Sequence, residues 1–253
     1  SKAWATDQRL FFVMEFSEPI IQEKISQTIE GSKFNSKGVF LFDGHVDTLE
    51  VKVALSAVDL EGARRNFNAE LANVEFEEAR INNSELWKTE LGKIQAEFSN
   101  DADAEIFYTA LYHTMIAPNL HSDVDGRYRG MDQEIYKGQD HDHFTVFSLW
   151  DTYRATHPLY TIIDHQRTNA LIGTLLRKYQ HGGILPIWDL SACYTGCMIG
   201  YHGVSVIADA FVKGIEDFDS DLALEAMINS ADQDHLGLYD YKSNGYISVE
   251  NEA

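Results

Sequence analysis

Residues 107–120 have the sequence FYTALYHTMIAPNL. Their apolar side chains recur at intervals of three and four residues, which is the spacing of one face of an α-helix. Pro118 cannot continue a helix, and either Asp101 or Asp103 can cap its beginning. The pattern therefore predicts a helix that ends at about Ala117.

Further helical patterns, separated by Gly- and Asp-rich loops, dominate the chain after this helix. A long loop is expected at residues 119–142. The expected helices after it span residues 143–157, 164–182, 198–213 and 219 or 221 to 231. Pro158, Gly183 and Gly214 would end the first three of these. Helix pairs of this length suit a toroid of α-hairpins, in which the loops at one end line a cleft.

Before the helices, the chain has β-strand patterns. Strands are expected at residues 9–16, 38–43 and 49–54, where aromatic and β-branched residues cluster. In the third, Val51 and Val53 alternate with charged residues, which predicts a half-buried strand with an apolar face. These strands resemble the end of an antiparallel sheet that other structure must cover.

Two charged, helix-rich segments, residues 59–72 and 75–98, join the strand region to the helical region. Their apolar residues are spaced as in amphipathic connecting helices. No flexible Gly/Ser linker separates the two regions, so we expect them to pack together. The sequence therefore predicts an α+β fold.

The composition excludes several classes of function. The 253 residues include 20 Lys and Arg against 40 Asp and Glu, so the formal net charge is −20. Phosphate backbones and anionic membranes would repel such a chain, so we expect no nucleic-acid partner and no membrane insertion. No apolar run approaches the roughly 20 residues that span a bilayer.

Local signatures are few. Cys193 and Cys197 allow two buried thiols, a local disulfide, or a reactive or metal-binding thiol. Neither Asp123 with Asp125 nor the aspartates at 217, 219 and 221 have the glycine that a calcium loop needs, so helix caps or solvated turns are expected there. We find no phosphate-binding loop and no nucleophile elbow.

Aromatic and acidic residues gather at the helix ends and loops. Sugars bind to aromatic faces and to carboxylates that accept from their hydroxyls. The candidate sugar-binding residues are Trp150, Asp151, Arg154, Trp188, Asp189 and His202. Each has a structural alternative: Trp150 and His202 can belong to the core, and Asp151 can form an ion pair with Arg154. Tyr128 and Arg129 are expected to anchor a loop.

Several of these segments resemble the sequence signature of glycoside hydrolase family 92, the exo-acting α-mannosidases. They are residues 107–120, 122–132, 145–152 and 197–202, followed by 206–210. The resemblance implies that residues 1–57 are the last strands of a β-sandwich, 58–100 a helical linker, and 101–253 the first part of an incomplete (α/α)6 toroid.

The resemblance also implies a mechanism. The family hydrolyses terminal α-mannose of glycans with inversion and needs Ca²⁺. An inverting pair of acid and base stands about 6.5–9.5 Å apart. In the family pattern both residues fall beyond Ala253, so this chain is expected to supply sugar-binding residues, and the isolated chain is expected to be inactive. The Ca²⁺ ligands are expected mostly outside this chain.

Two departures from the family pattern leave an alternative open. Asp189 stands where the family usually has Glu, and Cys193-Tyr194 stands where it usually has Asn-Glu. A degenerate member that binds mannosides without cleaving them is therefore the alternative. The resemblance implies a secreted or periplasmic protein. If the toroid is incomplete, its exposed apolar faces predict self-association.

Overall fold

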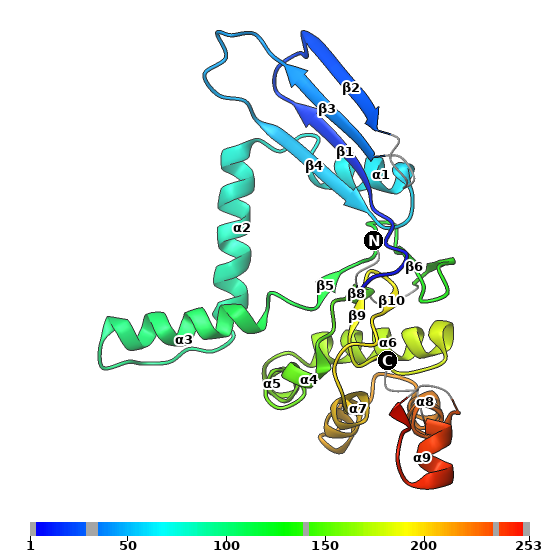
Figure 1. The fold of residues 1–253 in the computed structure, drawn as a ribbon. Helices are drawn as coiled ribbons and strands as arrows, with labels where there is room; N and C mark the ends of the chain where they lie inside the picture. The colour runs from blue at the N-terminus through cyan, green and yellow to red at the C-terminus, as the bar shows by residue number, and fades with distance from the viewer. Residues whose placement is uncertain (1–3, 29–34, 139–141, 235–237, 250–253) are drawn as a thin grey trace.

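The computed structural model describes residues 4–28, 35–138, 142–234 and 238–249. Figure 1 shows a strand region at one end of the molecule, connecting helices along one side, and the remaining helices at the other end. This arrangement confirms the predicted α+β class. Among the described residues, no helix combines the length and the apolar character needed to cross a membrane.

The strand region contains one strand more than expected. β1 (Phe11–Phe16) pairs antiparallel with β4 (Val51–Ser56), and β2 (Gln22–Thr28) pairs antiparallel with β3 (Asn35–Leu41). Strand β2 was not predicted, because its sequence QEKISQT is almost entirely polar and lacks the apolar alternation of a half-buried strand. The three expected strands correspond to β1, β3 and β4, with ends shifted by a few residues.

The buried face of β4 is the opposite of the expected one. Val51 and Val53 are exposed, whereas Ala54 and Ser56 are buried. Small side chains occupy the inward face of β4 because helix α1 (Leu60–Glu70) packs closely against it and leaves no room for larger ones. A Cβ added at Gly62 would lie 2.6 Å from Ser56 Oγ. The apolar face of β4 instead borders a groove of about 570 Å³.

The two connecting helices are present, and the second is shorter than expected. Asp59 caps α1 by accepting a hydrogen bond from the Gly62 N–H at 2.6 Å. Helix α2 (Phe76–Leu91) ends at Gly92, and none of its residues is buried. Figure 1 shows α2 running beside the rest of the molecule, toward α3 (Asp101–Thr114).

The helix expected to end at about Ala117 is α3, which ends at Thr114, and its cap is Asn100. The Asn100 carboxamide oxygen accepts from the Asp103 N–H at 2.9 Å, so neither predicted aspartate is the cap. The long loop after Pro118 contains short strands. They are β5 (Asn119–Leu120), β6 (Arg127–Arg129), β7 (Ile135–Lys137) and β8 (Phe144–Thr145), paired as β5–β8 and β6–β7.

The helix predicted at residues 143–157 is wrong. Strand β8 occupies its start, and Val146 has a φ of 64°, which an α-helix does not accept. Two short helices follow, α4 (Leu149–Thr152) and α5 (Thr156–Ile163). Pro158 does not stop a helix: it lies in the first turn of α5, where a backbone N–H has no partner within the helix.

Four longer or later helices complete the described part of the chain. They are α6 (His165–Gly182), α7 (His202–Val212), α8 (Ser220–Asp232) and α9 (Leu238–Asn244), and a hairpin of β9 (Asp189–Leu190) and β10 (Cys193–Tyr194) lies between α6 and α7. Asp164 caps α6, Gly183 ends it in the left-handed conformation, and Asp219 caps α8, as expected. Helix α7 begins later than predicted because Met198 and Gly200 have positive φ.

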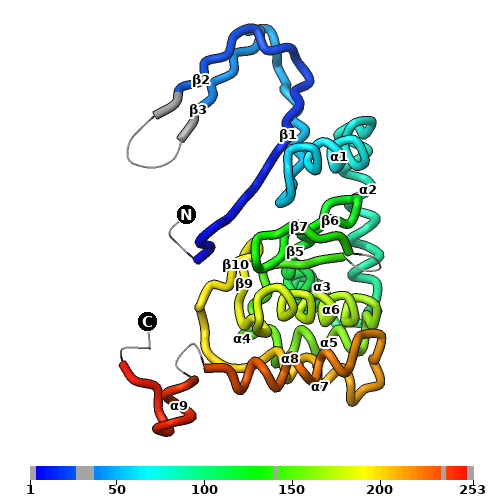
Figure 2. Tube along the Cα trace, turned by 90° about the vertical axis from the view of Figure 1, so that its right-hand side faces the viewer, coloured from blue at the N-terminus to red at the C-terminus, as the bar shows by residue number. Residues whose placement is uncertain are grey.

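Side chains from α4 to α8 form the main hydrophobic core. Its completely or almost completely buried members include Phe147, Leu149, Tyr160, Leu171, Ile172, Leu175, Ile207, Ala210 and Ala226. Figure 2 shows these helices stacked below the short strands of the loop region. The core therefore fixes the ends of α4 and α7, where four of the candidate residues lie.

Candidate functional site

An aromatic cluster forms where α4 meets the start of α7. The rings of Tyr153 and His202 stack at 4.0 Å with an interplanar angle of 9°, and Trp150 lies 5.5 Å from His202. The Arg154 guanidinium lies over the rings of Tyr153 and Trp150, 4.8 Å from the Tyr153 ring centroid and 5.4 Å from the Trp150 ring centroid. Three of the candidate residues are therefore neighbours, and Tyr153 joins them.

The carboxylate of Asp151 lies at the surface beside this cluster. Its Oδ2 accepts a hydrogen bond from the Ser148 hydroxyl, while its Oδ1 accepts none from the residues that the structure describes. In the same part of the chain no ion pair joins Asp151 and Arg154, because the arginine lies on the aromatic rings instead. Asp151 is thus an exposed acidic group that follows Trp150 on the short helix α4.

Trp188 connects to Asp151 through Ser148. Its indole Nε1–H donates to Ser148 Oγ at 2.8 Å, and the two residues also form an isolated antiparallel bridge. On its other side, Trp4 packs edge-on at 5.2 Å between ring centroids. Figure 2 shows the N-terminal segment beside β9 and β10, which explains how the start of the chain reaches this place.

Asp189 lies inside the protein. Its side chain is 0% exposed, its Oδ2 accepts from Lys178 Nζ and Thr145 Oγ1, both at 2.8 Å, and its Oδ1 accepts from the Phe147 N–H at 3.2 Å. Lys178 is equally buried. In this geometry Asp189 has no free surface for a sugar hydroxyl, and its contacts hold the segment that precedes α4.

His202 is neither fully exposed nor a satisfied core residue. It is half-buried, and its Nε2 has no hydrogen-bond partner within the described residues. The chain before it passes so close that a Cβ at Gly200 would lie 2.1 Å from Nε2, and the φ of Gly200 is 107°. Only glycine suits this position, since it combines a positive φ with close contact.

The structure brings five of the six predicted residues to one surface region and places the sixth, Asp189, beneath it. Tyr153, Ser148 and Trp4 were not among the predicted residues. Ser148 lies in the segment 145–152 that resembles the family signature, and Tyr153 directly follows this segment. No local pattern signals Trp4, because its partner Trp188 is distant in sequence.

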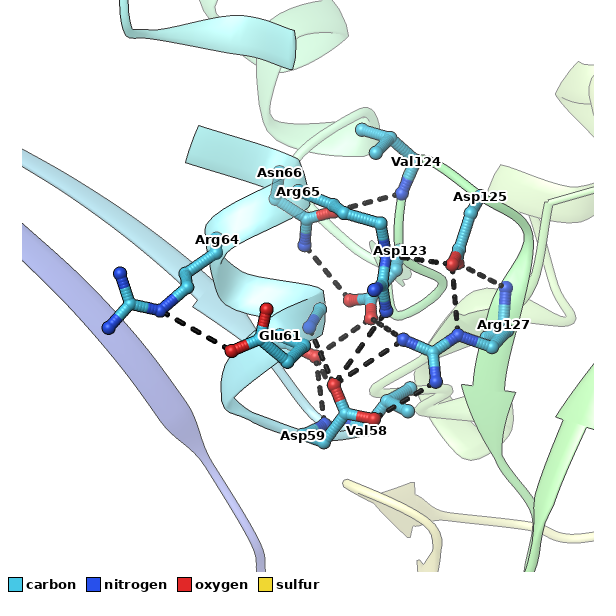
Figure 3. Close-up of polar contacts among 12 residues, drawn as sticks. Val58, Asp59, Glu61, Arg64, Arg65, Asn66, Asp123, Val124, Asp125 and Arg127 are labelled. Atoms are coloured by element: carbon cyan, nitrogen blue, oxygen red, sulfur yellow. Dashed lines mark hydrogen bonds and ion pairs between the residues drawn. The ribbon is translucent and has the colours of Figure 1, made fainter. Parts of the chain in front are cut away.

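A second polar network ties the linker to the loop after α3. Asp123 is buried and accepts from Ser56 Oγ at 2.8 Å and Asn66 Nδ2 at 2.9 Å. Arg127 contacts Asp59 and Asp125, both at 2.9 Å (Figure 3). Burial raises the pKa of Asp123. The expectation of a helix cap or a solvated turn at Asp123 is therefore wrong.

Tyr128 and Arg129 are loop anchors, as expected. Both are buried, and the Arg129 guanidinium donates to the backbone oxygens of Ala57 and Val58, each at 2.9 Å. Tyr128 stacks on His143 at 3.9 Å. These contacts join the β6–β7 hairpin to the residues before α1 and to the residue before β8.

The two cysteines are free thiols, so the local disulfide is excluded. Cys193 is buried, and its sulfur lies 3.5 Å from both the backbone N and the backbone O of Asp7, which fixes the N-terminal segment. Cys197 is half-buried. Tyr194 lies opposite Asp189 in the β9–β10 hairpin, and burial raises the pKa of Tyr194.

The described residues do not fit a calcium ion. They contain no group of three or more His, Cys, Asp or Glu side chains able to hold a metal. Three carboxylates, of Asp59, Asp123 and Asp125, do gather in one place, but Arg127 already contacts all three. A cationic guanidinium in that position leaves no place for a divalent cation.

An exposed carboxylate beside stacked aromatic rings and an arginine is the arrangement typical of a carbohydrate-binding site. The catalytic domain of glycosyl hydrolase family 92 matches residues 62–253. The chain belongs to this family, which confirms the resemblance seen in the sequence.

Solved structures of the family share this fold. The family GH92 α-mannosidase BT3965 from Bacteroides thetaiotaomicron is 33% identical, with a TM-score of 0.86 over 100% of this chain and 36% of its own. It has also been solved in complex with mannoimidazole. The inverting mannosidase BT2199 from the same organism is 28% identical, with a TM-score of 0.83 over 98% of this chain and 36% of its own.

A curated relative is the uncharacterized secreted glycosidase of Arthroderma benhamiae. It is 27% identical over 216 residues, which are 80% of this chain and 24% of the relative. The chain thus spans about a third or less of the length of the relatives it matches. The predicted boundaries between sandwich, linker and toroid stay a prediction.

Proposed function

We propose that this chain is part of a glycoside hydrolase that removes terminal α-mannose from glycans, acting from the chain end. The observation that carries the proposal is the exposed Asp151 carboxylate on the same short helix as Trp150, whose ring Arg154 covers, in a chain of glycosyl hydrolase family 92. The α-mannosidase BT3965 and the inverting mannosidase BT2199 share the fold of this chain, which supports mannose as the sugar.

In this proposal Asp151 Oδ1 accepts a hydrogen bond from a mannose hydroxyl, since a carboxylate oxygen without a partner is a strong acceptor. The Trp150 ring offers an apolar face to the C–H side of the sugar. Arg154 and His202 line the same region, and Trp188 borders it. All five stay predictions as sugar contacts.

The catalytic acid and base are proposed to lie outside this chain, and the reaction to proceed with inversion. The similar mannosidase BT2199 is an inverting enzyme, which supports inversion here. Of the two acidic candidates here, Asp189 is completely buried and bound to Lys178, so it cannot exchange protons with a substrate. Asp151 alone cannot form the two-carboxylate pair that inversion requires.

Calcium stays part of the proposal through the family resemblance. The described residues offer no ligand set for it. We therefore assign no calcium ligand in this chain and route no step of the reaction through the metal.

The decisive experiment compares the full-length protein with the isolated 253-residue chain on an aryl α-mannoside. We expect the full-length protein to release β-mannose, the inverted anomer, as its first product, followed by NMR of the anomeric proton, and the chain alone to release no mannose. Retention of configuration would overturn the inverting mechanism. Turnover by the isolated chain would overturn the placement of the acid and base elsewhere.

The second candidate function is mannoside binding without hydrolysis. It is favoured by the half-buried Tyr194, which occupies a position where the family usually has a carboxylate. Calorimetry of the full-length protein with a mannose-terminated oligosaccharide separates the two candidates. Binding without turnover would favour this alternative, whereas no binding and no turnover would reject both.

We also propose that the protein is secreted or periplasmic. The relative from Arthroderma benhamiae is named a secreted glycosidase, which supports this location. Fractionation of cells that express the native gene tests it, and recovery only in the cytosolic fraction would contradict it.

A further inference from the structure

Ser148 stands between a ring N–H and the candidate sugar-binding carboxylate. Trp188 Nε1–H donates to its Oγ at 2.8 Å, and its hydroxyl donates to Asp151 Oδ2. An indole nitrogen can only donate and an ionised carboxylate can only accept. The direction of both hydrogen bonds is therefore fixed, and the single Ser148 proton is committed to Asp151.

The backbone holds the same three residues in place. Ser148 forms an antiparallel bridge with Trp188, and the Leu149 N–H donates to the Ile187 carbonyl at 3.0 Å. The Asp151 N–H in turn donates to the Ser148 carbonyl at 3.1 Å. Because the distances between these backbones are set, the Ser148 hydroxyl has little freedom to leave its position.

Trp188 is itself fixed from two sides. Trp4 packs edge-on against its ring, and Thr195 Oγ1 donates to its carbonyl at 2.9 Å. The indole N–H of Trp188 is already bonded to Ser148, so it cannot donate a hydrogen bond to a sugar hydroxyl. The N–H of Trp188 can therefore contribute to binding only through Ser148.

We propose that Ser148 is a positioning residue, anchored by Trp188, that holds Asp151 with Oδ2 turned inward and Oδ1 presented to a mannose hydroxyl. The inference rests on the proposed function, since it assigns the geometry of the same carboxylate. It reassigns Trp188 from a sugar contact to the anchor of that carboxylate.

The test uses the full-length protein and an aryl α-mannoside. Ser148→Ala removes both hydrogen bonds, and Trp188→Phe removes the ring N–H but keeps most of the ring. We expect each to lower kcat/KM by about tenfold to a hundredfold, as for a lost hydrogen bond to a charged group. Ser148→Thr keeps the hydroxyl and should restore most of the activity.

A double-mutant cycle separates positioning from a merely structural role. If Ser148 acts through Asp151, Ser148→Ala should change kcat/KM little in an Asp151→Asn background. Full additivity would overturn the proposal, and so would wild-type kcat/KM in Ser148→Ala. Thr152→Val is the matched control: its hydroxyl donates to the Ser148 carbonyl and does not touch Asp151. It should keep wild-type activity.

Failure of this inference is distinguishable from failure of the proposed function. If Asp151→Asn itself has wild-type kcat/KM, the role of Asp151 in sugar binding is wrong. If Asp151→Asn is impaired and Ser148→Ala is not, only the positioning role is wrong. Melting curves show whether Ser148→Ala has lost its fold. If it has, Trp188→Phe replaces it in the double-mutant cycle.

Discussion

The ammonium of Lys178 lies 2.8 Å from Oδ2 of Asp189, and both side chains are completely buried. One comes from α6 and the other from the first position of β9, so their contact fixes the hairpin that carries Trp188 against the helical core. A buried charge that loses its partner is strongly destabilising, because nothing else compensates for its removal from water.

Asp189→Ala should therefore unfold at a lower denaturant concentration than the wild type. We expect the free energy of unfolding to fall by about 3–5 kcal/mol, measured by urea denaturation. Asp151→Ala, at the surface nearby, is the matched control and should cost far less. A loss below about 1 kcal/mol for Asp189→Ala would contradict the structural role of this pair.

Asp151→Asn should separate activity from stability. It keeps the shape of the side chain but weakens acceptance from a sugar hydroxyl, so kcat/KM of the full-length protein should fall by about a hundredfold. Because Asp151 forms no ion pair with Arg154, the melting temperature should hardly change. Unchanged kinetics with a lowered melting temperature would show that Asp151 serves the fold instead.

His157 should make the protein less stable in mild acid. Burial lowers its pKa from 6.5 to about 4. The folded protein keeps the ring neutral, whereas the unfolded chain takes up a proton below pH 6.5, so the free energy of unfolding decreases as the pH falls toward 4. The loss attributable to His157 should approach about 3 kcal/mol and then level off.

His157→Leu replaces this titrating group with an apolar side chain of similar size. Denaturation curves between pH 4 and 6.5 should show a shallower decline for this variant. Ile162→Leu, on the same helix, is the matched control. Neither the original nor the new side chain titrates, so this variant should lose as much free energy of unfolding as the wild type does when the pH falls. The same slope in both variants would reject the assignment.

The isolated chain should self-associate through the apolar face of β4. Val51, Val53 and Leu55 are all exposed there, and burying apolar surface is worth about 25 cal/mol per Å². Val53→Lys should reduce the associated fraction in sedimentation velocity. Thr48→Lys adds the same charge at the same edge without removing apolar surface, so it should have a smaller effect. A monomeric wild-type chain would refute this prediction.

Calcium removal should affect the full-length protein only. Chelation with EDTA should abolish turnover of an aryl α-mannoside, and added Ca²⁺ should restore it. Calorimetry of Ca²⁺ with the isolated chain should show no heat, since the described residues provide no ligand cluster. Full activity in EDTA would remove calcium from the proposed mechanism.

Much of the helical part could be predicted from local signals. Asp164 and Gly183 mark the ends of α6 because a carboxylate cap and a left-handed glycine act within a few residues of themselves. The 143–157 region could not be predicted in this way. There the Asp189 carboxylate accepts from Thr145 and Phe147, and this distant contact overrides the helical pattern.

The site shows the same division between local and distant causes. The segment around Trp150 and Asp151 stands out in the sequence, and the structure places it at the surface with Arg154 and His202. The burial of Asp189 could not be foreseen, because its partner Lys178 lies on another element and a buried lysine has no sequence signature. The reversed burial of β4 has a similar cause, the close approach of α1 at Gly62.

The polar network of Figure 3 has a consequence for protein engineering. Arg127 contacts Asp59 across 68 positions, and Asn66 binds both Asp123 and the Val124 N–H. A chimera of two homologues joined between residues 59 and 123 would therefore bring together donors and acceptors from different parents. A crossover upstream of Ser56 keeps all of them from one parent and is the natural splice point for exchanging the strand region.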